Sequence, residues 1–415
     1  MYPSRGRSAP LPIHASGLLA ALLLAACSEL PRAATQAPDP APTPTPIATA
    51  GNAVVATRAA DFSSGAHALV DLDTLAVEQN LAPVGSDLSV RAAGGHFYRV
   101  GRLFAGNAAN IIARFSPDAP ELPQYTYSTQ DAAKPDEGSN PYDIVEVAPD
   151  KAYVLRYGAG SLWVVNPQAQ SEGGFLQAEI DLSAFDGDGV PEMAAATVAA
   201  GRAYVLLQRL QFFDATQDSQ LVAIDIASDT LVDLDPDAPG VNSIELPARN
   251  ASEIVVAEGG DALYVLAVGG RDFNDDFTAF TPRYDGALLR VDLADHGVTT
   301  VLDDGTPQNA PYGQFADMAQ TADGTLWLVA GDPNAGGSNS LYRVDAQAGT
   351  ASAEGLPAQS QNTEITAANG GPRGALWLGL NAAQPGLLRV DGDTLSTRFL
   401  PLELVPLNID FVSAD

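Results

Sequence analysis

Residues 317–350, DMAQTADGTLWLVAGDPNAGGSNSLYRVDAQAGT, contain three apolar segments separated by turn-forming residues. The segments DMAQTA, TLWLVA and SLYRVD are six residues long, and glycine, aspartate and asparagine lie between them. Short segments rich in Leu, Val, Trp and Tyr with such residues between them are typical of antiparallel strands. This stretch therefore predicts a small antiparallel β-meander.

The same three-segment pattern recurs along the chain. The last segment has seven copies, which begin at Ala68, Asn110, Ser161, Gln220, Ala287, Ser340 and Gly386. The middle segment also has seven copies, which begin at Ala53, His96, Lys151, Arg202, Ala262, Thr325 and Ala375. Six copies of the first segment precede a partner, and they begin at Asp87, Asp143, Glu192, Glu253, Asp317 and Glu364. No helical periodicity interrupts these repeats.

The seventh copy of the first segment is Asn408-Ile-Asp-Phe-Val-Ser, near the C-terminal end of the sequence. Propellers often complete their last blade with strands from both ends of the chain, which removes exposed sheet edges. We therefore expect an all-β fold, a seven-bladed β-propeller of four-stranded blades over residues 51–415, in which N- and C-terminal strands share one blade. The repeat averages about 52 residues, above the ~40–45 of compact propellers, so the surplus lies in loops. A solenoid is the weaker alternative.

Residues 317–350 and 374–391 resemble bacterial propellers related to the YVTN and NHL repeats and to virginiamycin B lyase. The resemblance implies the fold, because its motif builds blades and carries no chemistry. Virginiamycin B lyase and its relatives depend on a histidine base and a metal-holding carboxylate near the channel. His67, His96 and His296 do not fit that role, since His96 opens a second strand and is expected at the opposite face.

The first 26 residues have the pattern of a signal peptide. Arg5 and Arg7 precede an apolar run over 17–26, which is too short for a membrane-spanning helix. The run ends in Leu-Ala-Ala-Cys27, which resembles the bacterial lipobox, so Cys27 is expected to carry diacylglyceryl and fatty acyl chains such as palmitate. Ser28 follows in place of aspartate, which by enterobacterial sorting indicates the outer membrane. We expect a lipid-anchored envelope protein with its propeller in the periplasm.

Residues 27–50 are the predicted lipidated cysteine and a tether rich in Pro, Ala and Thr. This segment lacks the large apolar residues that offset ordering entropy, so we expect a disordered linker. At roughly 3.1 Å per residue in polyproline II, about twenty residues span some 60 Å. Such a tether holds the propeller well away from the membrane.

The composition excludes two classes of partner. The formal net charge is -30, and Lys134 and Lys151 are the only lysines. Such a chain repels nucleic acid and anionic membrane surfaces, so the lipid anchor is the expected membrane contact. The acidity serves either solubility or recognition of a basic partner. Because Cys27 is the only cysteine, no internal disulfide forms, and we expect a monomer stabilised by its core.

Acidic residues open six of the seven innermost strands, called strands a of each blade (b, c and d follow outward). Propeller symmetry predicts that they surround the channel mouth, and they are Asp87, Asp143, Glu192, Glu253, Asp317 and Glu364. Arginines follow strand b on the same face, and they are Arg58, Arg102, Arg156, Arg209 and Arg271. Three interpretations remain open: ion pairs between blades, a bound cation such as calcium, or recognition of a basic ligand.

Two loops on this face add candidate residues. The longest loop between strands b and c spans 270–286, and its aromatic residues are Phe273, Phe277, Phe280 and Tyr284. They form either an interaction surface or a cover over the neighbouring blade. Asp186-Gly-Asp188-Gly suggests part of a calcium loop, although it lacks the EF-hand spacing, so an acidic turn is the alternative. Tyr142 and Tyr312 are expected on the same face.

These patterns support two functions. The first is a non-enzymatic binding or scaffolding lipoprotein that engages an envelope protein or a basic ligand through its acidic, aromatic-bearing face. The second is a calcium-dependent lyase, lactonase or hydrolase with its site at the channel mouth. A purely spacing role is a third reading. The sequence shows no zinc-ligand spacing, no G-x-S-x-G elbow and no phosphate-binding loop before a helix.

Overall fold

The computed structural model describes residues 51–134, 138–275, 279–332, 338–355, 363–392 and 394–413. The predicted signal peptide, Cys27 and the tether lie outside the described residues, as does Phe277. Within the described ranges, no helix has the length and apolarity that a membrane-spanning segment needs.

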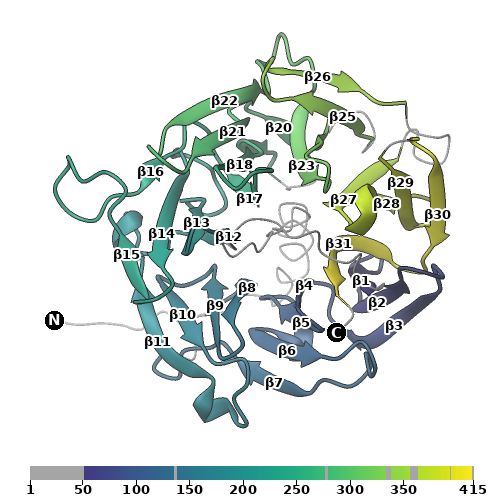
Figure 1. Cartoon of the computed structure of the whole chain (residues 1–415), viewed down its shortest axis with the longest axis horizontal. Helices are drawn as coiled ribbons and strands as arrows, with labels where there is room; N and C mark the ends of the chain where they lie inside the picture. The colour runs from purple at the N-terminus through teal and green to yellow at the C-terminus, as the bar shows by residue number, and fades with distance from the viewer. Residues whose placement is uncertain are drawn as a thin grey trace, which may run out of the picture.

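Seven antiparallel sheets follow one another around a central axis (Figure 1), and we number them as blades 1 to 7. From the axis outward, blade 1 contains β31 (Val405–Val412), β1 (Asn52–Arg58), β2 (Gly65–Asp71) and β3 (Val77–Val84). Blade 2 contains β4 (Leu88–Ala93), β5 (His96–Gly101), β6 (Ile111–Phe115) and β7 (Tyr125–Ser128). Blade 3 contains β8 (Pro141–Ala148), β9 (Lys151–Arg156), β10 (Ser161–Val165) and β11 (Leu176–Asp181).

The remaining blades repeat this order. Blade 4 contains β12 (Met193–Ala199), β13 (Arg202–Leu207), β14 (Gln220–Asp225) and β15 (Thr230–Val232), with β16 (Ile244–Glu245) also paired to β14. Blade 5 contains β17 (Ala251–Val256), β18 (Ala262–Ala267), β21 (Ala287–Asp292) and β22 (Val298–Asp303). Blade 6 contains β23 (Gln314–Gln320), β24 (Leu326–Gly331), β25 (Ser340–Asp345) and β26 (Thr350–Ala353). Blade 7 contains β27 (Glu364–Gly370), β28 (Ala375–Asn381), β29 (Gly386–Asp391) and β30 (Thr397–Pro401).

Short elements lie in the connections. A separate hairpin in the loop between β18 and β21 is formed by β19 (Arg271–Phe273) and β20 (Phe280–Pro282). Single turns of 3₁₀ helix occur at Gly106–Ala108, Glu172–Gly174, Ser183–Phe185 and Pro372–Gly374.

The apolar content of each strand follows from its distance to the axis. Inner strands pack between two neighbouring sheets, so both of their faces are buried and their sequences are almost continuously apolar, as in ALWLGLN of β28. Outer strands such as β11, LQAEID, are largely exposed and polar. Trp327 and Trp377 are among the largest fully buried side chains. The core is therefore a set of layers between blades.

Blades approach one another closely at the ends of their inner strands. Gly370, at the end of β27 in blade 7, lies against blade 6, where an added Cβ would come within 1.8 Å of the carbonyl oxygen of Gln320. Only glycine allows this backbone approach.

The ring closes as the sequence predicts. β1 pairs with β31 from Asn52↔Val412 to Arg58↔Val405, with a bulge between Ala56 and Thr57. The two ends of the coloured chain thus lie side by side in blade 1 (Figure 1). The predicted seven-bladed propeller with a shared closing blade is confirmed.

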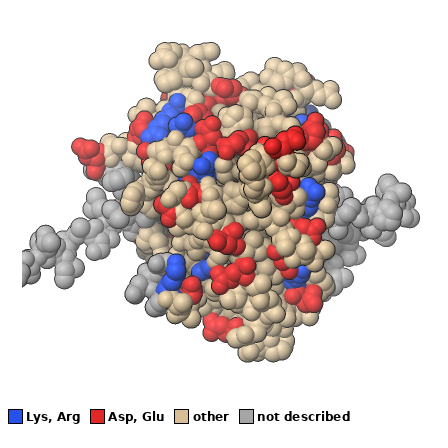
Figure 2. Space-filling view, turned by 90° about the vertical axis from the view of Figure 1, so that its left-hand side faces the viewer, with Lys and Arg blue, Asp and Glu red and all other residues tan. Residues whose placement is uncertain are grey.

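The two faces of the disc are distinguished by which strand ends lie on them. We call the face where strands a begin and strands b end the mouth face. Asn52 pairs with the last residue of β31, so the chain enters the propeller at the opposite face. Figure 2, a view onto the rim of the disc, shows acidic side chains spread over this surface and basic side chains in smaller number, in keeping with 51 acidic and 21 basic residues.

Candidate functional site

The six acidic residues that open strands a occupy two register positions. Asp143, Glu253 and Asp317 each follow a β-bulge and pair with Leu155, Leu266 and Val329 of strand b. Asn408 occupies the corresponding position in blade 1, opposite Ala56. Of the other three, Glu364 is the first residue of β27 and precedes its bulge, whereas Asp87 and Glu192 lie directly before β4 and β12; β12 has a bulge and β4 pairs without one. A bulge adds one residue to the strand. The number of residues between an acidic residue and the apolar segment therefore does not show which of the two positions that residue occupies.

The position after the bulge connects neighbouring blades. The Glu253 carboxylate accepts a hydrogen bond from Met318 N in blade 6 at 2.7 Å, and the Asp317 carboxylate accepts one from Ala368 N in blade 7 at 2.6 Å. The Asn408 amide accepts from Val90 N at 3.0 Å and donates to Val90 O at 2.8 Å in blade 2. All three side chains are buried. These residues hold blade to blade through backbone N–H groups, where the sequence suggested arginine ion pairs.

Asp143 forms an ion pair with Arg91, which was not predicted from the sequence. Arg91 of blade 2 lies with its Nη1 3.2 Å from Asp143 Oδ2 and its Nε 3.9 Å from Asp410 Oδ2 of blade 1. Burial raises the pKa of Asp143 to about 6, against the opposing charge of Arg91. The sequence feature that could have indicated this pair is Arg91, a charged residue inside the inner strand β4. This buried ion pair joins three blades on the axis.

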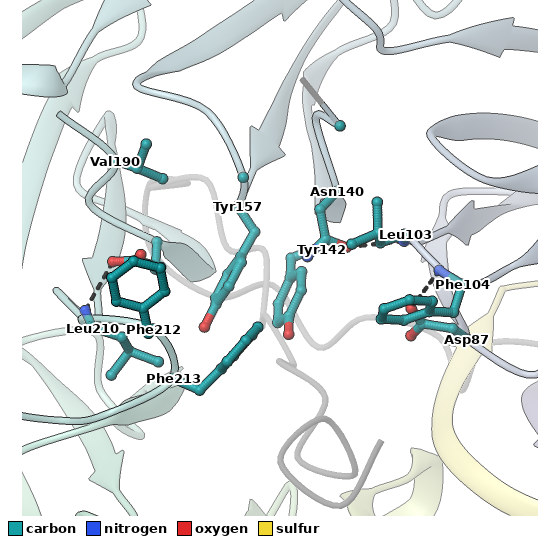
Figure 3. A pocket seen from close by; sticks show the side chains of 13 residues that line it. Asp87, Leu103, Phe104, Asn140, Tyr142, Tyr157, Val190, Leu210, Phe212 and Phe213 are labelled. Atoms are coloured by element: carbon teal, nitrogen blue, oxygen red, sulfur yellow. Dashed lines mark hydrogen bonds between the residues drawn. The ribbon is translucent and has the colours of Figure 1, made fainter. Parts of the chain in front are cut away.

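A pocket opens on the mouth face between blades 2, 3 and 4, and encloses about 260 Å³ (Figure 3). Five aromatic side chains line it: Phe104, Tyr142, Tyr157, Phe212 and Phe213. The polar lining includes Asp87, Asn140 and Glu192. Leu103, Val190 and Leu210 complete its apolar walls. A concave apolar site with a few polar groups is the usual form of a small-ligand site.

The two carboxyl groups of the pocket come from different blades, Asp87 from the start of blade 2 and Glu192 from the start of blade 4. Asp87 Oδ2 accepts a hydrogen bond from Phe104 N at 3.0 Å, and Glu192 Oε2 accepts one from Leu210 N at 2.8 Å. Burial raises the pKa of the Asp87 carboxyl, against the opposing charge of Arg102. Burial also raises the pKa of Glu192 to about 8, against the Leu210 hydrogen bond, and the nearby Asp188 and Asp186 add to the rise.

Glu192 has an unfavourable backbone conformation. Its φ is +48°, and the corresponding residues of blades 3 and 5, Asn140 and Asn250, have φ of +43° and +59°. Asparagine is the non-glycine residue best suited to this left-handed region, whereas glutamate gains nothing there. Strained residues of this kind concentrate at functional sites. The presence of glutamate here supports a role for its carboxyl group.

Phe212 and Phe213 are the central residues of a two-residue hairpin turn. Gln211 and Asp214 exchange two backbone hydrogen bonds of 2.9 Å, and φ is +50° at Phe212 and +70° at Phe213. Positive φ at both central positions defines a type I′ turn, which favours Asn-Gly. Phe212 is fully exposed, and Phe213 is 53% exposed. The turn therefore presents two phenylalanines at a cost in backbone energy and apolar exposure.

The hairpin in blade 5 braces this turn. Arg283 Nη1 lies 2.6 Å from Asp214 Oδ1, and Arg283 Nε donates to Asp272 Oδ1 at 2.8 Å. Of the aromatic residues predicted in this loop, Phe273 and Phe280 pack on each other with ring centroids 5.6 Å apart. Tyr284 is partly buried, and none of these three lines the pocket. The aromatic interaction surface was predicted in the longest loop, whereas Phe212 and Phe213 lie in the shorter loop between β13 and β14.

The arginines predicted at the mouth contact other groups. Arg156 Nε donates to Thr129 O at 3.1 Å, and its guanidinium lies 4.3 Å from the Trp163 ring centroid. Arg271 lies over the Phe280 ring. Arg209 Nε is 3.8 Å from Asp186 Oδ2, beside the pocket. Glu364 accepts a hydrogen bond from the Asn381 amide at 2.8 Å.

The predicted acidic loop forms local turns. Asp186 Oδ1 accepts a hydrogen bond from Asp188 N at 3.2 Å, and Asp188 Oδ1 accepts one from Val190 N at 2.9 Å. Across the described ranges, no group of three or more His, Cys, Asp or Glu side chains is arranged to hold a metal ion. These two aspartates add to the negative potential around Glu192.

Comparison with known proteins supports the fold alone. No protein-family model and no curated protein matches the sequence. A Bacteroides fragilis protein provisionally named 6-phosphogluconolactonase is 13% identical with a TM-score of 0.55, over 90% of this chain and 100% of that chain. A protein from Lactobacillus plantarum is 13% identical with a TM-score of 0.55, over 88% and 100%.

Virginiamycin B lyase from Staphylococcus aureus is 14% identical with a TM-score of 0.48, over 76% of this chain and 85% of that chain. The two structures with TM-scores of 0.55 confirm that the likeness to bacterial propellers suggested by the sequence is a likeness of fold. At these identities it says nothing about activity.

Proposed function

We propose that this chain is a lipid-anchored binding module of the cell envelope, whose mouth face engages a basic group through the aromatic pocket. The observation that carries the proposal is the pocket of about 260 Å³, which is lined by two carboxyl groups and five aromatic side chains. Buried carboxyl groups with raised pKa values in a concave site are candidates for functional groups.

The position of the pocket suits a tethered module. The chain enters β1 at the face opposite the mouth. If residues 27–50 form the expected tether to the membrane, the pocket is directed away from the anchor. A ligand or an envelope protein then reaches the pocket without passing between the propeller and the bilayer.

The exposed turn supports binding as well. Phe212 and Phe213 extend the apolar lining to the surface from blade 4, and the exposed Leu103 does so from blade 2. Exposed aromatic and aliphatic side chains at the rim of a pocket are typical of an interaction site.

Site-specific photo-cross-linking in native membranes tests the proposal. A benzoylphenylalanine at Phe212 probes the pocket rim, and one at Leu122 is the matched control, because Leu122 is an exposed apolar residue in the loop between β6 and β7, at the opposite face. We expect a discrete adduct from position 212 and none from position 122. Equal labelling from both positions, or none from either, would contradict the proposal.

A further inference from the structure

The aromatic rings of the pocket differ in what covers them. The Arg102 guanidinium lies 4.1 Å from the Tyr142 ring centroid, and Tyr157 stacks on the same ring at 3.9 Å with an interplanar angle of 13°. Both faces of Tyr142 are therefore covered. In Figure 3, Tyr157 lies between Tyr142 and the segment of Phe212 and Leu210, with Phe213 below it. Phe212 and Phe213 are exposed at the rim, Tyr157 lines the pocket beside them, and Phe104 lines the wall near Asp87.

The two carboxyl groups differ in how their charge is balanced. Asp87 lies in the field of Arg102, which already opposes its negative charge. The charges that raise the pKa of Glu192 are those of Asp188 and Asp186, and Arg209 partly offsets the second. A cation beside Glu192 would be attracted mainly by the carboxylates of Glu192 and Asp188 and by the negative faces of the nearby rings. A neutral ligand gains none of this electrostatic attraction.

The size of the site and the conformation of its turn limit the ligand. A volume of about 260 Å³ admits a small molecule, and is too small to enclose a folded partner. The type I′ turn holds two phenylalanines where Asn-Gly is favoured, and their exposed rings supply neither an oxygen or nitrogen ligand for a metal ion nor an N–H or O–H donor for an anion. Rings and carboxylates together are the groups that recognise alkylated ammonium ions.

We propose that the pocket binds a small organic ammonium cation, with its alkyl groups against Tyr157, Phe212 and Phe213 and its charge facing Glu192. This inference rests on the proposed binding function and names the chemistry of the ligand. The raised pKa of Glu192 supports it, because a bound cation would stabilise the ionised carboxylate. Binding would then release a proton near neutral pH.

Two probes of the same shape test the role of charge. Choline carries a trimethylammonium group, and 3,3-dimethyl-1-butanol carries a tert-butyl group of the same shape without the charge. We expect choline to bind the full-length protein at least about tenfold more tightly at pH 8, measured by calorimetry. Equal binding of the two probes, or tighter binding of the alcohol, overturns the inference.

A double substitution separates binding from folding. F212N/F213G installs the preferred Asn-Gly sequence in the type I′ turn, so the protein should remain folded with an unchanged or higher Tm. The same variant should lose about tenfold or more in choline affinity, because two aromatic faces are removed. Retention of choline binding by this well-folded variant contradicts the proposed site.

A charge variant completes the test. Glu192→Gln should weaken choline binding about tenfold and remove the proton release, whereas Glu354→Gln, on an exposed segment of blade 6, should leave both unchanged. If choline fails to bind while position 212 still gives its cross-linked adduct, the ammonium inference is wrong and the binding function stands. If both fail, the proposed function falls too.

Discussion

Asp317 in blade 6 and Glu192 in blade 4 both lie at the mouth-face end of an innermost strand, yet they have different surroundings. The Asp317 carboxylate is buried between blades and bonds to Ala368 N at 2.6 Å. The Glu192 carboxyl is partly buried, lines a pocket and has acidic neighbours. The first stabilises the ring, and the second is available to a ligand. Asp317 follows the bulge of its strand and Glu192 precedes the bulge of its own, so the register position and the hydrogen-bond partner together distinguish the two roles.

Removing the Asp317 carboxylate should have the largest effect on stability. Asp317→Ala leaves the Ala368 N–H buried without its acceptor, which costs about 2–3 kcal/mol. We expect the Tm of the propeller to fall by roughly 3–4 °C, as measured by circular dichroism. Glu192→Ala at pH 7 should lower the Tm by less than about 1 °C.

The matched control for this comparison is Asp317→Asn. Asn408 already makes the corresponding bond to Val90 N in blade 1, so an amide oxygen at position 317 should retain most of the stability. A larger loss of stability in Glu192→Ala than in Asp317→Ala would contradict the assignment of the two roles.

Loosening the turn should have an intermediate effect, on binding only. Arg283→Ala removes the brace between Asp214 and Asp272. Because these pairs are largely solvent-exposed, we expect less than about 1 kcal/mol in stability. A mobile turn should weaken choline binding about threefold, because the phenylalanines must then be ordered on binding.

Arg290 offers a matched control for that variant. It pairs with Asp261 and Asp292 in the same blade, away from the turn. Arg290→Ala should change the stability by a similar small amount and leave choline affinity unchanged. An equal loss of affinity in both arginine variants would show that the hairpin does not position the turn.

The pH dependence of stability should give the smallest effect. Folding raises the pKa of Glu192 to about 8, of Asp304 to about 7 and of Asp143 to about 6, with burial as the main cause. The folded state therefore binds more protons than the unfolded state between the ordinary carboxyl pKa values and these raised ones. Stability should rise as pH falls from 9 towards 5.

Glu192→Gln should flatten the upper part of this profile, because the amide has no charge to desolvate. We expect its Tm to exceed that of the parent by roughly 1–3 °C at pH 9 and to match it at pH 5. Identical profiles for the two proteins would show that the Glu192 carboxyl is not penalised in the folded state.

The sequence predicted the fold more fully than the site. Seven repeats and the closing segment at Asn408 determine the ring, because strand pairing leaves few alternatives to a closed propeller. Asp87, Glu192 and Tyr142 were also predicted at the mouth. The bulges before Asp143, Glu253 and Asp317 were not, since one added backbone residue leaves no mark in an apolar pattern.

The aromatic turn could not be predicted for a related reason. Phe212 and Phe213 follow strand b in a loop of ordinary length, and their function depends on a positive φ at both positions and on Arg283 from the next blade. A contact between blades and a left-handed turn are properties of the folded ring. A consecutive Phe-Phe pair on the mouth face was the one local signal.

The titration of the Glu192 carboxyl group tests most directly whether Glu192 differs from Asp317 as described. It is monitored by ¹³C NMR of glutamate-labelled protein, and the Glu192→Gln variant assigns the signal. The pKa should be about 8 in the free protein and should fall when tetramethylammonium is added. A pKa near the ordinary value of about 4.3, or one that the cation leaves unchanged, would contradict the presence of an uncompensated carboxyl group in a cation-binding pocket.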